Sequence, residues 1–241
     1  MALLTEERVR QMSDNGARGP VVVARGDVLT PAARSFLREH RVEVVYPQGG
    51  GADSQGTARY QTPFGVELEE KPEHMTHLRG NLLVFKDHPR IAFRGMIDLL
   101  EGEIALCQQV CAREGVTALA EELEEALAFV RRFIRFDVLE EPVGEVKLCG
   151  LTPEELRERS HYPEKYYGQG HFLIHYTDSP AILAVNRVRT VARQTELAAY
   201  RAFRDESGGV TRGDILLGLN RLSSLLWIMM IRLKAGDYRA D

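Results

Sequence analysis

The amino-acid sequence predicts a mainly α-helical protein, an antiparallel helical bundle preceded by a small α/β module. Apolar residues recur with helical periodicity over four long segments, whereas the first 47 residues contain short alternating runs. A stretch rich in glycine and polar residues separates these parts. We therefore expect a small module over 1–47, a flexible linker over 48–70 and a helical-bundle domain over 71–241, with irregular structure over 58–80. The long helices are expected over residues 90–114, 117–139, 180–206 and 211–235.

The N-terminal module is expected to alternate helices and strands. Thr5 can cap a short helix, and Thr30 followed by Pro31 is a strong helix start. Threonine is a favoured N-cap residue, and proline fits the first helical position. Short strands are predicted at residues 21–24 and 42–46.

Capping residues mark where the later helices begin. Thr117, Ser179 and Thr211 stand at the starts of three long helices, and Thr152 opens a short helix with a capping-box pattern. Between them, residues 160–178 form a polar loop with three histidines and four tyrosines. Helical bundles place ligand sites between facing helices or at subunit contacts, where inward polar groups converge.

Composition narrows the class of protein. A chain of 241 residues can form one sizeable core and a small appendage. The net charge of −4 argues against an obligate nucleic-acid binder. No apolar run reaches the roughly 18 residues of a membrane span, and no signal peptide is recognisable. Three cysteines are too few for a disulfide framework. We expect a cytoplasmic protein that binds neither nucleic acid nor membrane.

Two of the long helices carry polar side chains on faces that should be buried. One stripe consists of Arg189, Arg193, Glu196 and Tyr200, and the other of Asn220, Ser224 and Trp227. The second helix ends in a strongly apolar run, so its polar groups need partners. Those partners are either one another or a bound anionic ligand, which makes these helices the place to look for function.

Basic residues also gather where the first long helix begins. Lys86 and Arg90 flank its first turn, and Arg94 follows one turn later. Cationic side chains beside a helix N-terminus can form a polyphosphate site. The alternative is a charged loop followed by a surface helix.

Asp98 lies within an apolar stretch of the same helix, so its carboxylate is expected to point into or beside the bundle. A buried aspartate favours an arginine partner, and Arg189 is the natural one. A purely structural ion pair is the alternative. The nearby Arg187, Arg193 and Glu196 provide more charge than one structural bridge requires.

Two further groups of residues have both a functional and a structural interpretation. The histidines at 74 and 77 and the cysteines at 107 and 111 could suggest a metal, but no third ligand stands at a suitable spacing, and packing is favoured. The loop with His161, Tyr166 and Phe172 could close over a flat ligand or be an ordinary surface loop.

Residues from about 71 to 235 resemble the corrinoid adenosyltransferases, in particular the ethanolamine-utilisation type. The matching runs are Lys71-Pro72, Thr76-His77-Leu78, Lys86-Asp87-His88-Pro89-Arg90 with Arg94 and Asp98, Ser160-His161 with Pro163 and Tyr166, Arg189-Thr190-Val191-Ala192-Arg193 with Glu196, and Leu219-Asn220-Arg221-Leu222-Ser223-Ser224. The later runs are shared more loosely with the propanediol-utilisation type.

This resemblance implies a fold and a reaction. The bundle would be of the cobalamin adenosyltransferase kind, assembled as a homotrimer with active sites between subunits. The enzyme would transfer the 5′-deoxyadenosyl group of ATP, with Mg²⁺, to the cobalt of cob(I)alamin, through a four-coordinate cob(II)alamin intermediate. A reductase and a B12-dependent lyase, ethanolamine ammonia-lyase, would be its partners, in the cytoplasm or inside a bacterial microcompartment.

The resemblance also implies roles for individual residues. Asp98, Arg189, Arg193 and Asn220 would be the catalytic residues, with Asp98 and Arg189 as an ion pair that shapes the pocket. Lys86 and Arg90 would bind the ATP phosphates. The remaining cofactor-binding residues would be Arg94, Arg187, Glu196, His161, Tyr166 and Phe172, and Phe172 would displace the lower axial ligand of the corrinoid.

The sequence departs from the family pattern at two points. Residues 75–79 replace the glycine-rich nucleotide loop of the propanediol relatives. Some ethanolamine-type members also carry a histidine–cysteine metal cluster upstream of that point, whereas the first cysteine here is Cys107. We therefore expect no metal site, and activity that needs only Mg²⁺ and ATP. The alternative functions are a corrinoid carrier or escort without catalysis, and a shell-associated interaction protein that docks through residues 1–47.

Overall fold

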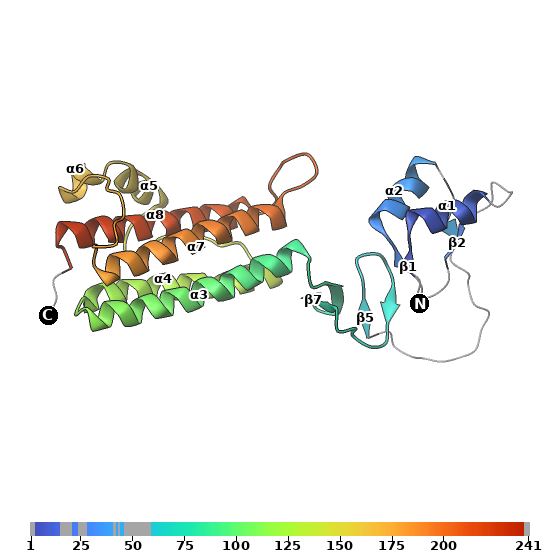
Figure 1. Cartoon of the computed structure of the whole chain (residues 1–241), viewed down its shortest axis with the longest axis horizontal. Coiled ribbons are helices and arrows are strands. Elements are labelled where there is room, and N and C mark those ends of the chain that lie inside the picture. The colour runs from blue at the N-terminus through green and yellow to red at the C-terminus, as the bar shows by residue number, and fades with distance from the viewer. Residues whose placement is uncertain are drawn as a thin grey trace. The chain divides into compact units, whose positions relative to one another are not determined.

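The computed structural model describes residues 3–14, 21–23, 28–40, 42, 44–45 and 59–238. The chain forms two compact units, Met1–Glu70 and Lys71–Asp241, and each is described by itself (Figure 1). Residues 48–58 of the predicted linker lie outside the described residues, and its remaining part carries two short strands.

The first unit combines short parallel strand pairs with two helices. In chain order its first elements are β1 (Leu3–Leu4), α1 (Glu6–Asp14), β2 (Val21–Val22), β3 (Val28–Leu29), α2 (Pro31–Glu39) and β4 (Val44–Val45). Strand β1 pairs with β3 and β2 pairs with β4, both in parallel. The Thr30 hydroxyl accepts a hydrogen bond from the Ala33 backbone N–H at 3.2 Å, so α2 begins at the predicted cap. The predicted alternation of helices and strands is confirmed.

Three short strands lie within residues 58–80, which were expected to be irregular, so that prediction was wrong, and a fourth strand follows directly. They are β5 (Tyr60–Gln61), β6 (Glu67–Leu68), β7 (Met75–Arg79) and β8 (Leu82–Phe85). Strands β5 and β6 form one antiparallel pair, and β7 and β8 form a hairpin. Strands of two residues are too short to show a period, and an irregularity between His77 and Arg79 interrupts the alternation in β7.

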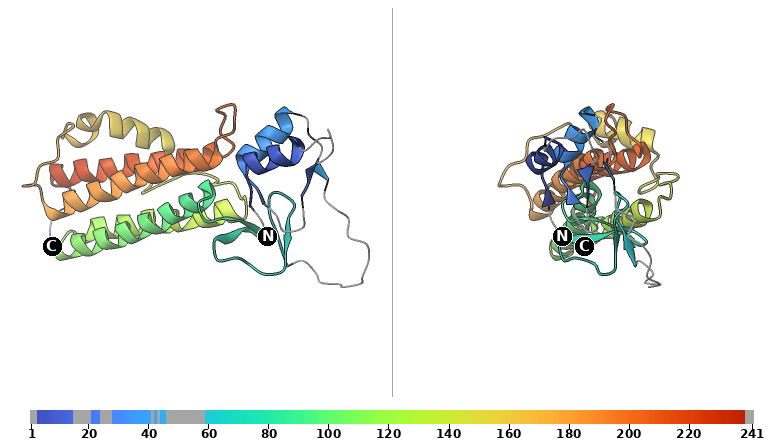
Figure 2. Two further views of the ribbon diagram at one scale, coloured as in Figure 1. Left: turned by 45° about the vertical axis from the view of Figure 1, so that its right-hand side comes forward. Right: turned by 90° about the vertical axis from the view of Figure 1, so that its right-hand side faces the viewer.

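The second unit is an antiparallel bundle of four long helices. These are α3 (Pro89–Arg113), α4 (Thr117–Val138), α7 (Pro180–Phe203) and α8 (Gly213–Ala235). Helices α3 and α4 form one layer, and α7 and α8 form the other (Figure 2). The short helices α5 (Pro153–His161) and α6 (Pro163–Tyr167) pack against α8, at the end of the bundle opposite to β7 (Figure 1). The predicted fold class is confirmed.

Helix ends follow the predicted caps in part. The Ser179 hydroxyl accepts the Ile182 N–H, and Thr152 forms the expected capping box. Thr117 is the first residue of α4 rather than its cap. The hydroxyl of Thr211 donates to the Phe203 carbonyl at 2.9 Å, and α8 begins two residues later. These two threonines match a cap only in residue type, because tertiary contacts determine where each helix begins.

The bundle core is built from the apolar faces of all four long helices. Helix α8 contributes most completely, since ten of its residues from Ile215 to Ile231 are buried. By length and composition α8 could cross a membrane, but 61% of its most apolar stretch is buried inside the protein, as in a core helix. Its polar residues therefore lie at the edge of an apolar core.

Candidate functional site

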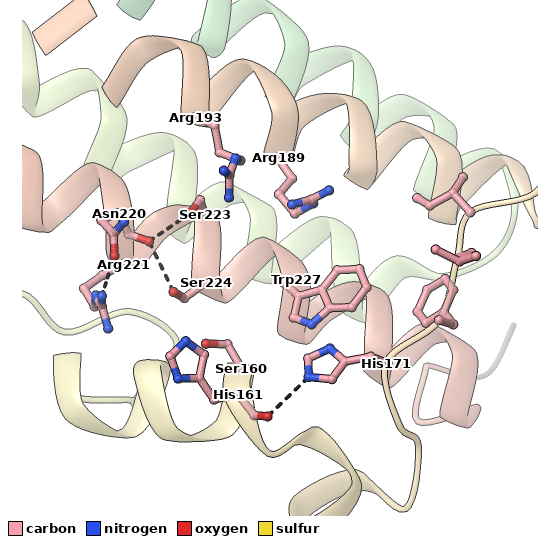
Figure 3. A pocket seen from close by; sticks show the side chains of 13 residues that line it. Ser160, His161, His171, Arg189, Arg193, Asn220, Arg221, Ser223, Ser224 and Trp227 are labelled. Carbon is pink, nitrogen blue, oxygen red and sulfur yellow. Dashed lines mark hydrogen bonds between the residues drawn. The ribbon is translucent and has the colours of Figure 1, made fainter. Parts of the chain in front are cut away.

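A cavity of about 490 Å³ lies where α5, α7, α8 and the loop after α6 meet (Figure 3). Its volume falls in the range of small-molecule sites. The lining combines basic, amide, hydroxyl and aromatic side chains from segments far apart in the sequence. Prominent among them are Arg189, Arg193, Asn220, Ser224, His171 and Trp227. Both predicted polar stripes thus contribute to one cavity.

One stripe of α8 forms the floor of this cavity. Asn220, Ser224 and Trp227 lie on one helix face, as the helical period predicts, and all three line the cavity. The Ser224 hydroxyl donates to the Asn220 backbone carbonyl at 3.2 Å. The Ser223 hydroxyl donates to the same carbonyl at 3.0 Å. The hydroxyl groups are therefore satisfied within the helix, and the Asn220 amide is left for other partners.

The Asn220 amide connects α8 to α7. Its Nδ2 donates to Glu196 Oε1 at 3.0 Å, and its Oδ1 accepts a short hydrogen bond from Arg221. Arg221 also donates to the Pro153 carbonyl at 3.3 Å, where α5 begins. The Asn220 amide and Arg221 together thus link α8 to α7 and to α5.

The two arginines of α7 that line the cavity, Arg189 and Arg193, have no carboxylate partner among the described residues. Arg189 donates to Asn186 Oδ1 at 3.0 and 3.3 Å, and its guanidinium lies 5.4 Å from the Trp227 ring centroid. Burial, together with the neighbouring Arg193, lowers the pKa of Arg189. Adjacent cations that stay unneutralised repel each other, so this side of the cavity attracts an anion.

Aromatic rings form the other side of the cavity. Trp227 stacks against His171 with ring centroids 5.7 Å apart, and against Phe172 at 5.3 Å. A ring nitrogen of His171 lies 3.2 Å from the His161 backbone carbonyl oxygen. Leu173, next in the chain, is 94% exposed. The loop after α6 therefore presents a flat apolar surface to the cavity, with an exposed leucine beside it.

The predicted pair of Asp98 and Arg189 is not formed within the described part of the chain. The Asp98 side chain is exposed, because the buried face of α3 runs through Ile97, Leu100 and Ile104. The expectation that this carboxylate points into the bundle was therefore wrong. An apolar neighbourhood in the sequence does not establish which helix face a residue occupies.

Two of the basic residues expected at the polyphosphate site lie elsewhere and have protein partners. Arg90 and Arg94 each donate through Nε to Asp137, at 2.6 Å, and the Asp137 side chain is completely buried. Arg94 also donates to the backbone carbonyls of His77 and Leu78 in β7. We call Arg90, Arg94 and Asp137 the Asp137 clamp. It joins the β7–β8 hairpin to α3 and α4, at the end of the bundle away from α5 and α6 (Figure 1).

The remaining predicted ligands fall outside the cavity lining, with the exception of His161 and Phe172. Lys86 is exposed, just before α3. Arg187 forms a two-pronged ion pair with Glu103, with both distances at 2.6 Å. The Tyr166 hydroxyl donates to Glu158 at 2.5 Å.

A model of the cobalamin adenosyltransferase family matches residues 66–233, which is more than half of the chain. The chain belongs to the cobalamin adenosyltransferase family. It is 36% identical to the corrinoid adenosyltransferase EutT of Escherichia coli K12 over 225 residues, which cover 84% of this chain and 81% of the relative. The EutT of Salmonella typhimurium is 30% identical over the same shares. The predicted enzyme class, an ATP:corrinoid adenosyltransferase, is confirmed.

A solved structure supports the fold of this cobalamin adenosyltransferase. It is a variant of the PduO-type ATP:corrinoid adenosyltransferase from Lactobacillus reuteri, in complex with cobalamin and ATP. The TM-score is 0.53 with 19% sequence identity, over 67% of this chain and 88% of the other. At this identity the likeness concerns the fold.

Sequence reasoning missed the partners of several arginines in this cobalamin adenosyltransferase. Asp137 is the main omission. It falls one turn after Phe133 and two turns after Val130, on the buried face of α4, so the helical period could have identified it as a buried charge. Arg221 was quoted only as part of a motif, although it directly follows Asn220.

No cluster of three or more histidine, cysteine or acidic side chains that could hold a metal ion occurs in the described ranges of this adenosyltransferase. Cys107 and Cys111 are buried in the core and interact with each other. The Glu196 carboxylate reaches the polar side of the cavity by accepting a hydrogen bond from Asn220. The expectation of activity without a transition metal stays a prediction.

Proposed function

We propose that this enzyme transfers the 5′-deoxyadenosyl group of ATP to the cobalt of cob(I)alamin. Family membership supports the reaction type. The observation that carries the assignment to this cavity is its division into a cationic side and an aromatic side. ATP presents a polyanion and cobalamin presents a broad apolar ring, so the two halves of the cavity complement the two substrates.

The arginine side suits the triphosphate. Arg189 and Arg193 have no carboxylate partner in the described structure, and bidentate guanidinium groups bind phosphate oxygens strongly. When the C5′–O bond of ATP breaks, the electron pair stays on the leaving tripolyphosphate. Cations placed beside that charge stabilise the transition state more than the ground state. Asn220 would direct its amide toward the same region.

We assign the Mg²⁺ that accompanies ATP to a carboxylate beside the cavity. Magnesium in nucleotide sites is commonly held by one or two carboxylates together with the phosphates. Glu196 meets this requirement, because it accepts from Asn220 at the edge of the cavity. When bound, Mg²⁺ would neutralise charge on the phosphate chain.

The aromatic side suits the corrinoid. Trp227, His171 and Phe172 form a stack beside the cavity. Cob(I)alamin attacks C5′ with a cobalt lone pair, so cob(II)alamin must first gain one electron from a reductase. An apolar ring under the cobalt would exclude the lower axial ligand and favour four-coordinate cob(II)alamin, which is easier to reduce. We assign this role to Phe172, with His161 and Tyr166 as its neighbours in the loop region.

Asp98 fits a site that is completed by a second copy of the chain. Its carboxylate is exposed, while Arg189 has no carboxylate within its own described chain. We propose a homotrimer in which Asp98 of one subunit pairs with Arg189 of the next. Lys86 is also exposed and would reach ATP across the same contact. The pair expected from the sequence would then form between subunits.

The biological setting follows from the similarity to the EutT relatives. We propose that the adenosylcobalamin serves ethanolamine ammonia-lyase, in the cytoplasm or inside a bacterial microcompartment. Residues 1–47 would then be a docking module.

An assay separates the enzyme from a corrinoid carrier. Purified protein is mixed with chemically reduced cobalamin and Mg²⁺–ATP, and the light-sensitive cobalt–carbon product is followed by absorbance. We expect many equivalents of product per subunit. Tight binding of cobalamin with at most one equivalent of product would favour the carrier instead.

A further inference from the structure

Arg221 is an unusual residue on α8. Its guanidinium is partly buried and has no carboxylate partner among the described residues, and its Nε–H is buried without an acceptor. Burial lowers the pKa of Arg221, as does the nearby Arg157. Arg232, three turns along the same helix, is held by both oxygens of Glu122 at 2.8 Å. A buried cation with an unsatisfied donor destabilises a fold, so Arg221 requires an explanation other than stability.

The remaining donors of Arg221 suggest that explanation. Nη1 of Arg221 donates to the Pro153 carbonyl at 3.3 Å, and Nη2 donates to Asn220 Oδ1. A guanidinium can only donate, and a carboxylate can only accept. With Arg221 on one side and Glu196 on the other, the Asn220 amide is held in a single orientation. Its oxygen must face Arg221, and its nitrogen must face Glu196.

This orientation leaves one donor for a ligand. The Asn220 amide nitrogen carries two hydrogens, and one of them is used by Glu196. Asn220 and Arg193 both line the cavity, from α8 and α7 (Figure 3). A flipped amide would instead present its oxygen, an acceptor, which would repel phosphate oxygens. The direction of this amide therefore decides whether the cavity floor attracts or repels an anion.

We infer that Arg221 is a positioning residue, which holds the Asn220 amide with an N–H directed at the triphosphate of ATP. This inference rests on the proposed function, because it requires that Asn220 contacts ATP. A role as a tether between α5 and α8 would need only the bond to Pro153. That bond is long, and it does not account for a charged side chain with an unsatisfied Nε–H.

A double-mutant cycle tests the inference on the full-length protein. Arg221→Met, Asn220→Ala and the double variant are compared with the wild type for kcat/KM and for the Kd of Mg²⁺–ATP measured by calorimetry. We expect Arg221→Met and Asn220→Ala each to lower kcat/KM and to raise the Kd of Mg²⁺–ATP by about tenfold. The double variant should be no worse than Asn220→Ala alone. Arg221→Lys keeps a cationic donor group that can reach the Asn220 oxygen and is expected to recover most of the loss.

A control separates positioning from stability. Arg232→Met removes another partly buried guanidinium from α8, and we expect it to lower the Tm without weakening Mg²⁺–ATP. Independent, multiplying effects of Arg221→Met and Asn220→Ala would overturn the inference. The inference would also be overturned if Arg221→Met lowered the Tm but left the affinity for Mg²⁺–ATP unchanged, as we expect of Arg232→Met. If the wild type binds Mg²⁺–ATP but makes no adenosylcobalamin, the proposed reaction fails, while the coupling measured in Kd still decides the role of Arg221.

Discussion

Two groups of arginines lie in the same helical bundle, and they differ in what each guanidinium meets. In the Asp137 clamp, Arg90 and Arg94 share a completely buried carboxylate. At the cavity, Arg189 has only an amide oxygen, and Arg193 has no ion-pair or hydrogen-bond partner among the described residues. Residue type is the same in both groups. The presence or absence of a carboxylate distinguishes the arginines that hold the fold together from the arginines that we assign to the ligand site.

The largest expected effect concerns the clamp. Asp137→Ala leaves two arginines without their shared partner, and breaking a buried pair costs about 3–5 kcal/mol. We expect a loss of that order in the free energy of unfolding, measured by urea denaturation. Asp137→Asn should lose less, because its amide oxygen still accepts one of the two bonds.

Asp137→Ala also tests whether Arg90 and Arg94 serve the fold or the nucleotide. If Asp137→Ala unfolded at the wild-type urea concentration but no longer bound Mg²⁺–ATP, Arg90 and Arg94 would belong to the nucleotide site after all. The clamp would then be a binding device instead of a structural one.

The next effect concerns the cavity. Arg189→Ala and Asn220→Ala are each expected to lower turnover at least about tenfold, or roughly 1.4 kcal/mol of transition-state stabilisation. The free energy of unfolding should change little, because Arg189 is not part of a buried ion pair. Steady-state kinetics and urea denaturation measure the two quantities.

Arg135→Ala is the matched control for these cavity variants. It removes an exposed arginine that pairs with Glu141 at the surface, so we expect wild-type kinetics. Near-wild-type turnover in both cavity variants would show that the cavity is not the active site.

These expectations show how far the sequence leads and where it stops. The helical period predicted the bundle, and it predicted that Asn220 and Trp227 share a face. It could not predict that Arg90 and Arg94 form ion pairs with Asp137, because these contacts join residues more than 40 positions apart. Helix pairing, which brings such residues together, is encoded in packing rather than in any local pattern.

The next variant tests whether the aromatic side of the cavity acts separately from its cationic side. Phe172→Ala removes a ring that stacks on Trp227. We expect it to reduce the four-coordinate cob(II)alamin signal in electron paramagnetic resonance, with Mg²⁺–ATP affinity nearly unchanged, because the ring lies on the aromatic side. Phe172→Leu should keep part of the signal, since it retains apolar bulk. Lost ATP affinity with an intact signal would assign the loop to the nucleotide.

A smaller effect is expected from the ion pair between the exposed Arg187 and the buried Glu103. The hydrogen bonds from Arg187 lower the pKa of Glu103 below its ordinary value near 4.5. A carboxylate with a depressed pKa stabilises the fold above its unfolded-state pKa, and this contribution disappears as the pH falls through its folded-state pKa. Glu103→Gln should therefore be slightly less stable than the wild type at pH 7.

Thermal unfolding at several pH values measures this difference in stability. It should shrink as the pH falls below about 4.5. A difference in Tm that stays constant from pH 7 down to pH 3 would mean that the charge of Glu103 is irrelevant to stability.

The smallest expected effect is that of metal removal. The described residues contain no metal-binding cluster. Chelation of transition metals, followed by added Mg²⁺–ATP, should leave both turnover and Tm unchanged. A stoichiometric transition metal in anaerobically purified protein, lost together with activity on chelation, would contradict this expectation. It would also mean that the reaction depends on a transition metal in addition to the arginines of either group.

Trp227 is the single tryptophan of the chain, and it lies in the cavity between the arginine and aromatic sides. Indole emission from the whole protein therefore originates at one point, where the stacked His171 and the cationic Arg189 both affect it. A substrate that separates either neighbour from the indole would change the emission. The protein thus carries an intrinsic optical probe, with which the order and rates of ATP and corrinoid binding can be followed in stopped flow without any label.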